Sequence, residues 1–160
     1  MDQKLLLEYF EYKDGKLYRK IVPKHSRANI GELVTGTKKH DYFHMKIQGS
    51  DYLVHRVVFL YHHGYLPEFI DHIDGDTSNN KIENLREATR TQNFQNSKKT
   101  IRNKSGVKGV FWHKIKNRWI ARVSVNGKEI HVGTFTDLDE ATKAVKQFRE
   151  KHHGEYARHD

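Results

Sequence analysis

Four polar residues between positions 71 and 93 have the types and spacing that phosphodiester chemistry requires. Asp71 and His72 are adjacent, Asn84 follows His72 by 12 residues, and Asn93 follows it by 21. An imidazole can take a proton from water near neutral pH. A divalent ion held by oxygen ligands beside that base can neutralise charge on a phosphate and on the leaving oxygen. The pattern therefore indicates a candidate site for metal-assisted attack of water on a phosphate ester.

The segment that carries these residues must be folded tightly enough to bring them together. Residues 70–93 contain two apolar segments around a loop rich in Asp, Asn, Ser, Thr and Gly, which predicts a short hairpin. Neighbours on a strand point to opposite faces, so Asp71 and His72 need a twist or loop at the strand end to serve one phosphate. Asn84 lies in the connection and could fix the loop through backbone hydrogen bonds. The sequence ATRTQNFQN then predicts a helix, in which Asn93 sits about one turn from the start and could face Asp71.

A plain structural explanation of the same segment also exists. The polar residues of the connection could form nothing more than a hairpin loop, with His72 an ordinary strand-end residue. Turn formation accounts by itself for Asn79 and Asn80. His55 could pack beneath the site and Arg56 could clamp a phosphate, or both could simply pack at a strand-to-helix junction. The pairs His62-His63 and His152-His153 have no companion at ligand spacing and are expected to be surface residues at helix ends.

Composition limits both the metal and the partner. The 160-residue chain has no cysteine, so any metal must be held by nitrogen or oxygen ligands, which favours one divalent ion such as Mg²⁺ or Mn²⁺. The net charge is +9, which favours a polyanionic partner. Residues 97–160 hold 15 Lys and Arg against 7 Asp and Glu, whereas residues 1–96 hold 14 against 13. No apolar run reaches membrane-spanning length and the N-terminus does not read as a signal peptide, so no membrane partner is expected.

The remaining sequence predicts two small cores in an α+β chain. We expect short strands and turns over residues 1–50, including a hairpin at 12–20 and a turn at 49–51. A helix should run from His55 to Gly64. Residues 97–106 are polar and basic and predict a linker between domains at 1–96 and 107–160. Three strands should fill 107–135, followed by a helix capped by Thr136 or Asp137 and stopped by Gly154.

The motif around Asp71-His72 resembles the HNH nuclease family, in the branch found among phage and intron homing endonucleases. The matching residues are Asp71-His72, the IDGDTSNN loop, Asn84-Leu85-Arg86, Thr89 and Asn93, with His55-Arg56 upstream. The resemblance implies a ββα-metal fold, with His72 as general base, Asp71 and Asn93 as metal ligands and Asn84 as the residue that braces the loop. Asn93 replaces the final His of the family's name, which favours Mg²⁺ or Mn²⁺ over zinc. It also implies a location in the cytoplasm of a phage-infected or otherwise bacterial cell.

The basic C-terminal part resembles the AP2 DNA-binding domain. The resemblance is carried by Gly106, Lys108-Gly109-Val110, Trp119, Ala121, Gly127-Lys128, Gly133-Thr134-Phe135 and Glu140-Ala141. It implies a three-stranded sheet in the major groove, with Lys108, His113, Arg122 and Ser124 facing DNA and Lys116, Arg118, Lys128 and His131 at the rim. Phe111 and Ser124 replace arginines of plant members, so the plant target sequence is not expected. Trp119 is expected in the core. Trp112 could be a core or edge aromatic, or could lie against a sugar or a thymine methyl.

Together the two resemblances imply a metal-dependent endonuclease of homing type that cuts double-stranded DNA. A single active site favours a monomer that nicks one strand, and two nicks by separate molecules or by a transient dimer are the alternative. A DNA-binding regulator with an inert HNH motif is a rival from another class. A nuclease directed by nucleic-acid structure or by RNA is a second rival.

Overall fold

The computed structural model describes residues 1–22, 24, 27–34, 36–97 and 103–159. The chain divides into two compact units, residues 1–88 and residues 89–160. Each unit has its own cluster of buried apolar side chains, as the composition predicts. Most of the predicted 97–106 linker, namely residues 98–102, lies outside the described residues, so that domain boundary stays a prediction. No helix in the described ranges is both long and apolar enough to cross a membrane.

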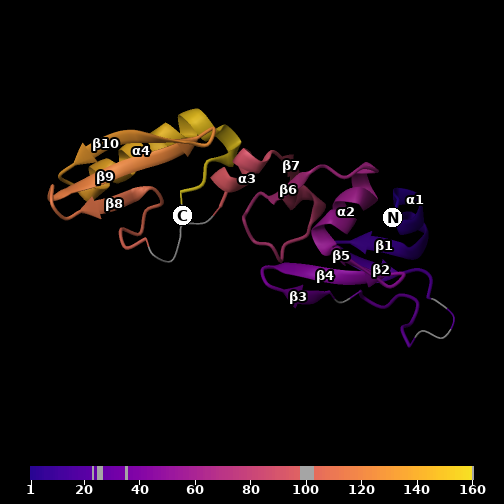
Figure 1. Cartoon of the computed structure of the whole chain (residues 1–160). Helices are drawn as coiled ribbons and strands as arrows, with labels where there is room; N and C mark the ends of the chain where they lie inside the picture. The colour runs from indigo at the N-terminus through magenta and orange to yellow at the C-terminus, as the bar shows by residue number, and fades with distance from the viewer. Residues whose placement is uncertain (23, 25–26, 35, 98–102, 160) are drawn as a thin grey trace. The chain divides into compact units, whose positions relative to one another are not determined.

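The described residues of the first unit form two helices and three small antiparallel sheets (Figure 1). Strands β1 and β2 pair with each other, β3, β4 and β5 form the second sheet, and β6 pairs with β7. The elements are α1 (Gln3–Tyr9), β1 (Phe10–Lys13), β2 (Lys16–Arg19), β3 (Thr37–Lys39), β4 (Tyr42–Ile47), β5 (Ser50–Leu53), α2 (Val54–His63), β6 (Phe69–His72), a 3₁₀ turn (Ile82–Asn84) and β7 (Leu85–Ala88).

Helix α2 is central to the first core and was predicted almost to its bounds. It ends at Gly64, whose φ of 77° places it in the left-handed region that closes many helices. Its residues Val57 and Val58 are fully buried against side chains from α1, β1, β2 and β4. The hairpin predicted at 12–20 is confirmed as β1–β2, with Asp14 and Gly15 at positive φ in the turn.

The N-terminal segment is a correction, because strands were expected where α1 forms. The side chain of Asp2 accepts a hydrogen bond from the backbone N–H of Leu5 and caps the helix. Leu6 is fully buried, and Gln3 donates from Nε2 to the carbonyl of Tyr61 at the end of α2. These contacts favour a helix over the strand that the apolar run alone allows. The turn between β4 and β5 also lies at Gln48-Gly49, one or two residues earlier than expected.

The second unit contains a three-stranded antiparallel sheet with one long helix across it (Figure 1). The sheet order is β10-β9-β8, and the predicted Asn126-Gly127 turn joins β9 to β10. Asp137 caps the helix and Gly154 ends it, both as predicted. The elements are α3 (Arg90–Gln95), β8 (Val110–His113), β9 (Arg118–Val125), β10 (Lys128–Phe135), α4 (Leu138–His153) and a 3₁₀ turn (Gly154–Tyr156).

One end of α4 differs from expectation. His152 is exposed, but His153 is only 9% exposed and its Nε2 donates to the carbonyl of Ser124 at 3.0 Å. Arg149, one turn earlier, is 2% exposed and donates to the carbonyls of Lys108 and Arg158. The prediction of a surface His152-His153 pair is therefore wrong for His153. Its ring fills space along β9, where a polar partner compensates its burial.

Two glycines have the same φ angle but differ in the space around them, so replacing each by alanine distinguishes backbone strain from a steric clash. Gly109 and Gly127 both have a φ of +77°. A Cβ at Gly109 would lie 2.3 Å from the carbonyl oxygen of Arg122, whereas a Cβ at Gly127 would meet no atom within 4 Å. We expect Gly127→Ala to cost about 1–2 kcal/mol of unfolding free energy from the left-handed conformation alone. Gly109→Ala should cost clearly more, because the backbone of β9 must also move.

Urea unfolding followed by tryptophan fluorescence would measure both changes, since the only two tryptophans lie in the second unit. Equal losses for the two variants would show that the close approach at Gly109 does not constrain the fold.

Candidate active site

The predicted Asp71-His72 pair lies at the end of β6, in the hairpin that β6 forms with β7. Asp71 pairs with Arg86 and His72 with Leu85 across the two strands. Both residues are only 4% exposed. Two polar side chains this deeply buried require partners, and those partners fix their orientations.

Asp71 is held by an arginine from the neighbouring strand. Its Oδ2 accepts a hydrogen bond from Nε of Arg86 at 2.9 Å and lies 2.9 Å from Nη2 of the same guanidinium. This pair compensates the burial of both charges and sets the direction of the carboxylate. Arg86 was part of the matching motif, but its role could not be derived from the sequence, because only the cross-strand register places it opposite Asp71.

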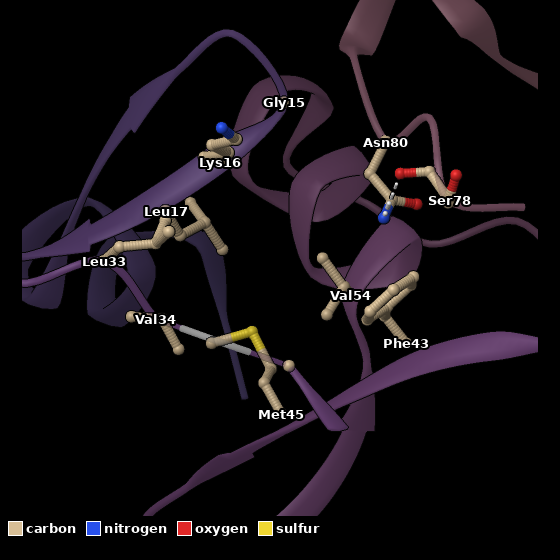
Figure 2. A pocket seen from close by; sticks show the side chains of 11 residues that line it. Gly15, Lys16, Leu17, Leu33, Val34, Phe43, Met45, Val54, Ser78 and Asn80 are labelled. Atoms are coloured by element: carbon tan, nitrogen blue, oxygen red, sulfur yellow. Dashed lines mark hydrogen bonds between the residues drawn. The ribbon is translucent and has the colours of Figure 1, made fainter. Parts of the chain in front are cut away.

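His72 is held by Asn80, which the sequence assigned to turn formation. Nε2 of His72 lies 3.1 Å from Oδ1 of Asn80, and the Asn80 side chain is 7% exposed. The other end of the same amide, Nδ2, donates to the carbonyl of Ser78 at 3.4 Å, as Figure 2 shows. The amide is thereby oriented with its oxygen toward the imidazole, so Nε2 must carry the proton in the neutral ring. The basic lone pair of neutral His72 is then on Nδ1.

Asn80 also lines a mainly apolar pocket of about 280 Å³ (Figure 2). Its walls include Leu17, Met45 and Val54, and no carboxylate or imidazole lines it among the described residues. Among the described residues of its lining, the ionisable side chain is that of Lys16.

The loop between β6 and β7 is tied together around Asn84. Oδ1 of Asn84 accepts from the backbone N–H of Asp74 at 3.0 Å, and Nδ2 donates to Asp74 Oδ1 at 2.9 Å and to the carbonyl of Asn79 at 2.8 Å. Asn79 in turn donates to Asp74 Oδ2. Asn84 thus braces the loop that presents Asn80 to His72, which is the kind of contact that its place in the sequence suggests.

A second imidazole lies beside His72. The ring centroids of His55 and His72 are 5.1 Å apart in an edge-to-face arrangement, and Tyr42 lies 5.2 Å from His55. His55 is 6% exposed, and its burial is the main cause that lowers its pKa from 6.5 to about 3. His55 is therefore neutral at physiological pH and packs against the candidate base without adding charge beside it.

Arg56 has contacts that favour the packing alternative. Its Nη1 and Nη2 donate to the carbonyls of Glu68 and Pro67 at 3.2 and 3.1 Å. The guanidinium thereby holds the segment that leads into β6. A phosphate contact of Arg56 stays a prediction.

Asn93 lies in α3, in the second unit. Thr89 caps this helix in a reciprocal arrangement with Gln92, and the backbone N–H of Asn93 donates to the carbonyl of Thr89. Asn93 is thus in the first turn of a helix, as predicted. Along the chain, β6, β7 and α3 follow one another in the order of a ββα unit.

The donor set named from the sequence suits a hard divalent ion. Asp71 offers a carboxylate and Asn93 an amide oxygen, and Mg²⁺ is commonly held by one or two protein oxygens with water and phosphate completing the shell. Within the part of the chain that is described, no three His, Asp or Glu side chains gather into a closed metal cluster.

The residues predicted to contact DNA are distributed over the sheet of the second unit. Ala121 and Val123 pack into the core, so by alternation Arg122 and Ser124 face away from α4. His113 also alternates away from the core residue Val110. The residues Lys116, Arg118 and Lys128 are exposed at the turns or strand ends.

Two of these predicted DNA contacts have other partners in the structure. Arg122 pairs with Glu129 at 2.9 Å and lies over the ring of Phe111 at 5.2 Å. Lys108 is not on a strand, and its ammonium donates to the carbonyls of Gln95 and Ser97. The ammonium of Lys108 is thus bound to carbonyls at the end of α3 and just after it, and a DNA contact of Lys108 stays a prediction.

Comparison with known proteins identifies the hairpin segment. The family model described as HNH endonuclease matches residues 52–95. Protein 3.8 of Escherichia phage T7 is 38% identical over 90 residues, which cover 56% of this chain and 74% of that protein. No solved structure matches.

The depressed pKa of His55 makes a prediction about stability at low pH. Unfolded His55 takes up a proton near pH 6.5, but the folded protein resists that proton until about pH 3. The unfolded state thus binds more protons in this window, and stability is lost as the pH falls from about 6.5 toward 3. His55→Phe keeps an aromatic ring but cannot protonate. The free energy of unfolding should fall less steeply in this variant, by up to about 1.4 kcal/mol per pH unit.

Urea titrations followed by circular dichroism at several pH values would test this, with His63→Phe at the exposed end of α2 as the matched control. Parallel pH curves for wild type and His55→Phe would contradict a buried neutral imidazole.

Proposed function

Because the chain belongs to the HNH endonuclease family, we propose that it is a metal-dependent endonuclease of duplex DNA in which His72 is the general base. The observation that carries this proposal is the buried hydrogen bond from His72 Nε2 to Asn80 Oδ1. With Nε2–H donated to Asn80, the neutral ring has its basic lone pair on Nδ1, the form that a general base requires. The name of the phage relative describes no activity, and the homing type stays part of the proposal.

The roles of the other residues follow from this one. Nδ1 of His72 takes a proton from water, and the water oxygen attacks phosphorus. The bond to the 3′ oxygen breaks, which leaves a 3′-hydroxyl after protonation from solvent and a 5′-phosphate. Asp71 and Asn93 would hold the divalent ion, Mg²⁺ or Mn²⁺, which supplies charge neutralisation at the phosphate and the leaving oxygen. Arg86 orients Asp71, and Asn84 keeps the loop in the shape that presents Asn80.

The second unit would hold the enzyme on duplex DNA in the manner of an AP2 domain. Residues 97–160 carry most of the excess positive charge of the chain. His113, Arg122 and Ser124 lie on the face of the sheet opposite α4, and Arg118 and Lys128 extend from its strand ends. A narrow sheet of this kind fits the major groove. A chain with a single catalytic histidine of this type would act as a monomer that nicks one strand.

Cleavage of supercoiled plasmid tests the central role of His72. We expect nicking with Mg²⁺ or Mn²⁺, none with EDTA, and a rate at least roughly a hundredfold lower for His72→Ala. His63→Ala removes an exposed imidazole from the end of α2 and should keep the wild-type rate. If wild type and His72→Ala are equally inactive while both still bind DNA, a DNA-binding regulator with an inert motif is the better account.

The role of Asn80 can be separated from general stability by two substitutions. Asn80→Leu removes the acceptor for Nε2–H and should slow cleavage by roughly tenfold or more. Asn80→Asp keeps an acceptor but adds a negative charge, which raises the pKa of a neighbouring imidazole. The acid limb of the pH–rate profile should then move to higher pH, because His72 must be neutral to act. An unchanged acid limb in Asn80→Asp, together with a wild-type rate in Asn80→Leu, would show that Asn80 has no role in orienting His72 for cleavage.

A further inference from the structure

A cleft of about 470 Å³ runs along the edge strand of the second unit's sheet. Among the described residues, strand β8 pairs only with β9, while α4 packs mainly across β9 and β10 and leaves β8 less covered. The volume falls within the roughly 300–1,000 Å³ that is typical of small-molecule sites. The lining includes Trp112, Trp119, Phe111, Lys104 and Lys114. The cleft therefore combines a broad aromatic wall with two cationic side chains.

The aromatic wall is held in place from beneath. Trp112 and Trp119 are directly opposite each other on β8 and β9, and their ring centroids lie 5.0 Å apart at an interplanar angle of 65°. Trp119 packs against the core that α4 covers, whereas Trp112 is 42% exposed. A large ring that is anchored on one side and open on the other is a platform for stacking another flat ring.

The opposite wall is also preformed. Ser105 Oγ lies within hydrogen-bond distance of Asn103 Oδ1 and of the carbonyl oxygens of Val107 and Val110, and Asn103 Nδ2 donates to the carbonyl of Val107. These contacts fix the segment that precedes β8. A ligand entering the cleft would therefore not have to order this wall, which favours affinity.

The charge of the cleft selects the ligand. No Asp or Glu occurs from Asn103 to Lys128, and five Lys or Arg residues lie between Asn103 and Trp119. Lys104 and Lys114 line the cleft itself, and both are exposed. An aromatic platform flanked by ammonium groups suits a nucleotide within a strand. Its base is a flat ring that can stack, and a phosphate lies on each side of its sugar.

We propose that this cleft binds an unpaired nucleotide of DNA, with its base stacked on Trp112 and its flanking phosphates near Lys104 and Lys114. The proposal rests on the proposed function for its choice of DNA as the polymer. Within a duplex the faces of the bases are covered by their neighbours, so only an unpaired or extruded base can stack in this way. Trp112 alternates along β8 with Phe111 and His113, so this contact is separate from the duplex-facing side of the sheet. The enzyme would accordingly prefer DNA that contains a gap, a bubble or a single-stranded flank.

The two tryptophans of the chain both line the cleft, so intrinsic fluorescence reports on it directly. The full chain in EDTA, where no cleavage occurs, would be titrated with an oligothymidylate, with a blunt duplex and with oligouridylate at one salt concentration. We expect the oligothymidylate to quench the fluorescence more strongly than the duplex does. Trp112→Ala should weaken oligothymidylate binding, followed by anisotropy of a labelled strand, by roughly tenfold or more. Its affinity for blunt duplex should change less than twofold.

Two further variants keep the test decisive. Trp112→Phe keeps a stacking face and should recover most of the single-strand affinity, while Ile115→Ala alters a 94% exposed side chain in the adjacent turn and should behave as wild type. An equal loss for single strand and duplex in Trp112→Ala, or tighter binding of oligouridylate through Trp112, would overturn the proposal. Because these measurements involve no cleavage, an inactive His72 site would leave their outcome unaffected and would be detected separately in the plasmid assay.

Discussion

The hydrogen bond between His72 and Asn80 is the constraint on which the candidate site depends. His72 is 4% exposed, so its ring N–H requires a hydrogen-bond acceptor. Asn80 Oδ1 lies 3.1 Å from Nε2 and is that acceptor. Asn80 is itself oriented by Ser78, and the loop that carries it is braced by Asn84. This chain of contacts, each local to the β6–β7 hairpin, determines which ring nitrogen of His72 is basic. A nuclease that uses a histidine base needs that choice to be made before substrate arrives.

The charged side chains near His55 and His72 have partners of their own. Asp71 is compensated by Arg86 across the hairpin, and Arg56 is bound to two carbonyls instead of pointing into the site. The neighbouring ring, His55, is kept neutral mainly by burial. The second unit has a different electrostatic character, with a long acid-free segment around β8 and β9. The first unit thus supplies the candidate chemistry, and the second supplies the positive charge that would retain a polyanion.

The sequence predicted those parts of the structure whose signals are local. Alternating residues around the turns at Gly15 and Asn126-Gly127 identified two hairpins, and capping residues such as Asp137 identified α4. Helix α1 was missed because a short apolar run fits either state until Asp2 and the packing of Leu6 decide it. The role of Asn80 could not be read from a loop in which Asn79 is the same residue type, because only the folded loop turns one of them toward His72. The burial of His153 and the carbonyl contacts of Lys108 likewise depend on tertiary packing that no local pattern encodes.

The tautomer of His72 is the most direct test of this account. A long-range ¹⁵N–¹H correlation spectrum of the full chain, recorded at slightly alkaline pH without metal, distinguishes a ring protonated on Nε2 from one protonated on Nδ1. The account predicts the Nε2–H tautomer for His72, with Nδ1 carrying the lone pair that would accept a proton from water. A neutral His72 protonated on Nδ1 would contradict it, because Nδ1 would then have no lone pair with which to accept a proton from water.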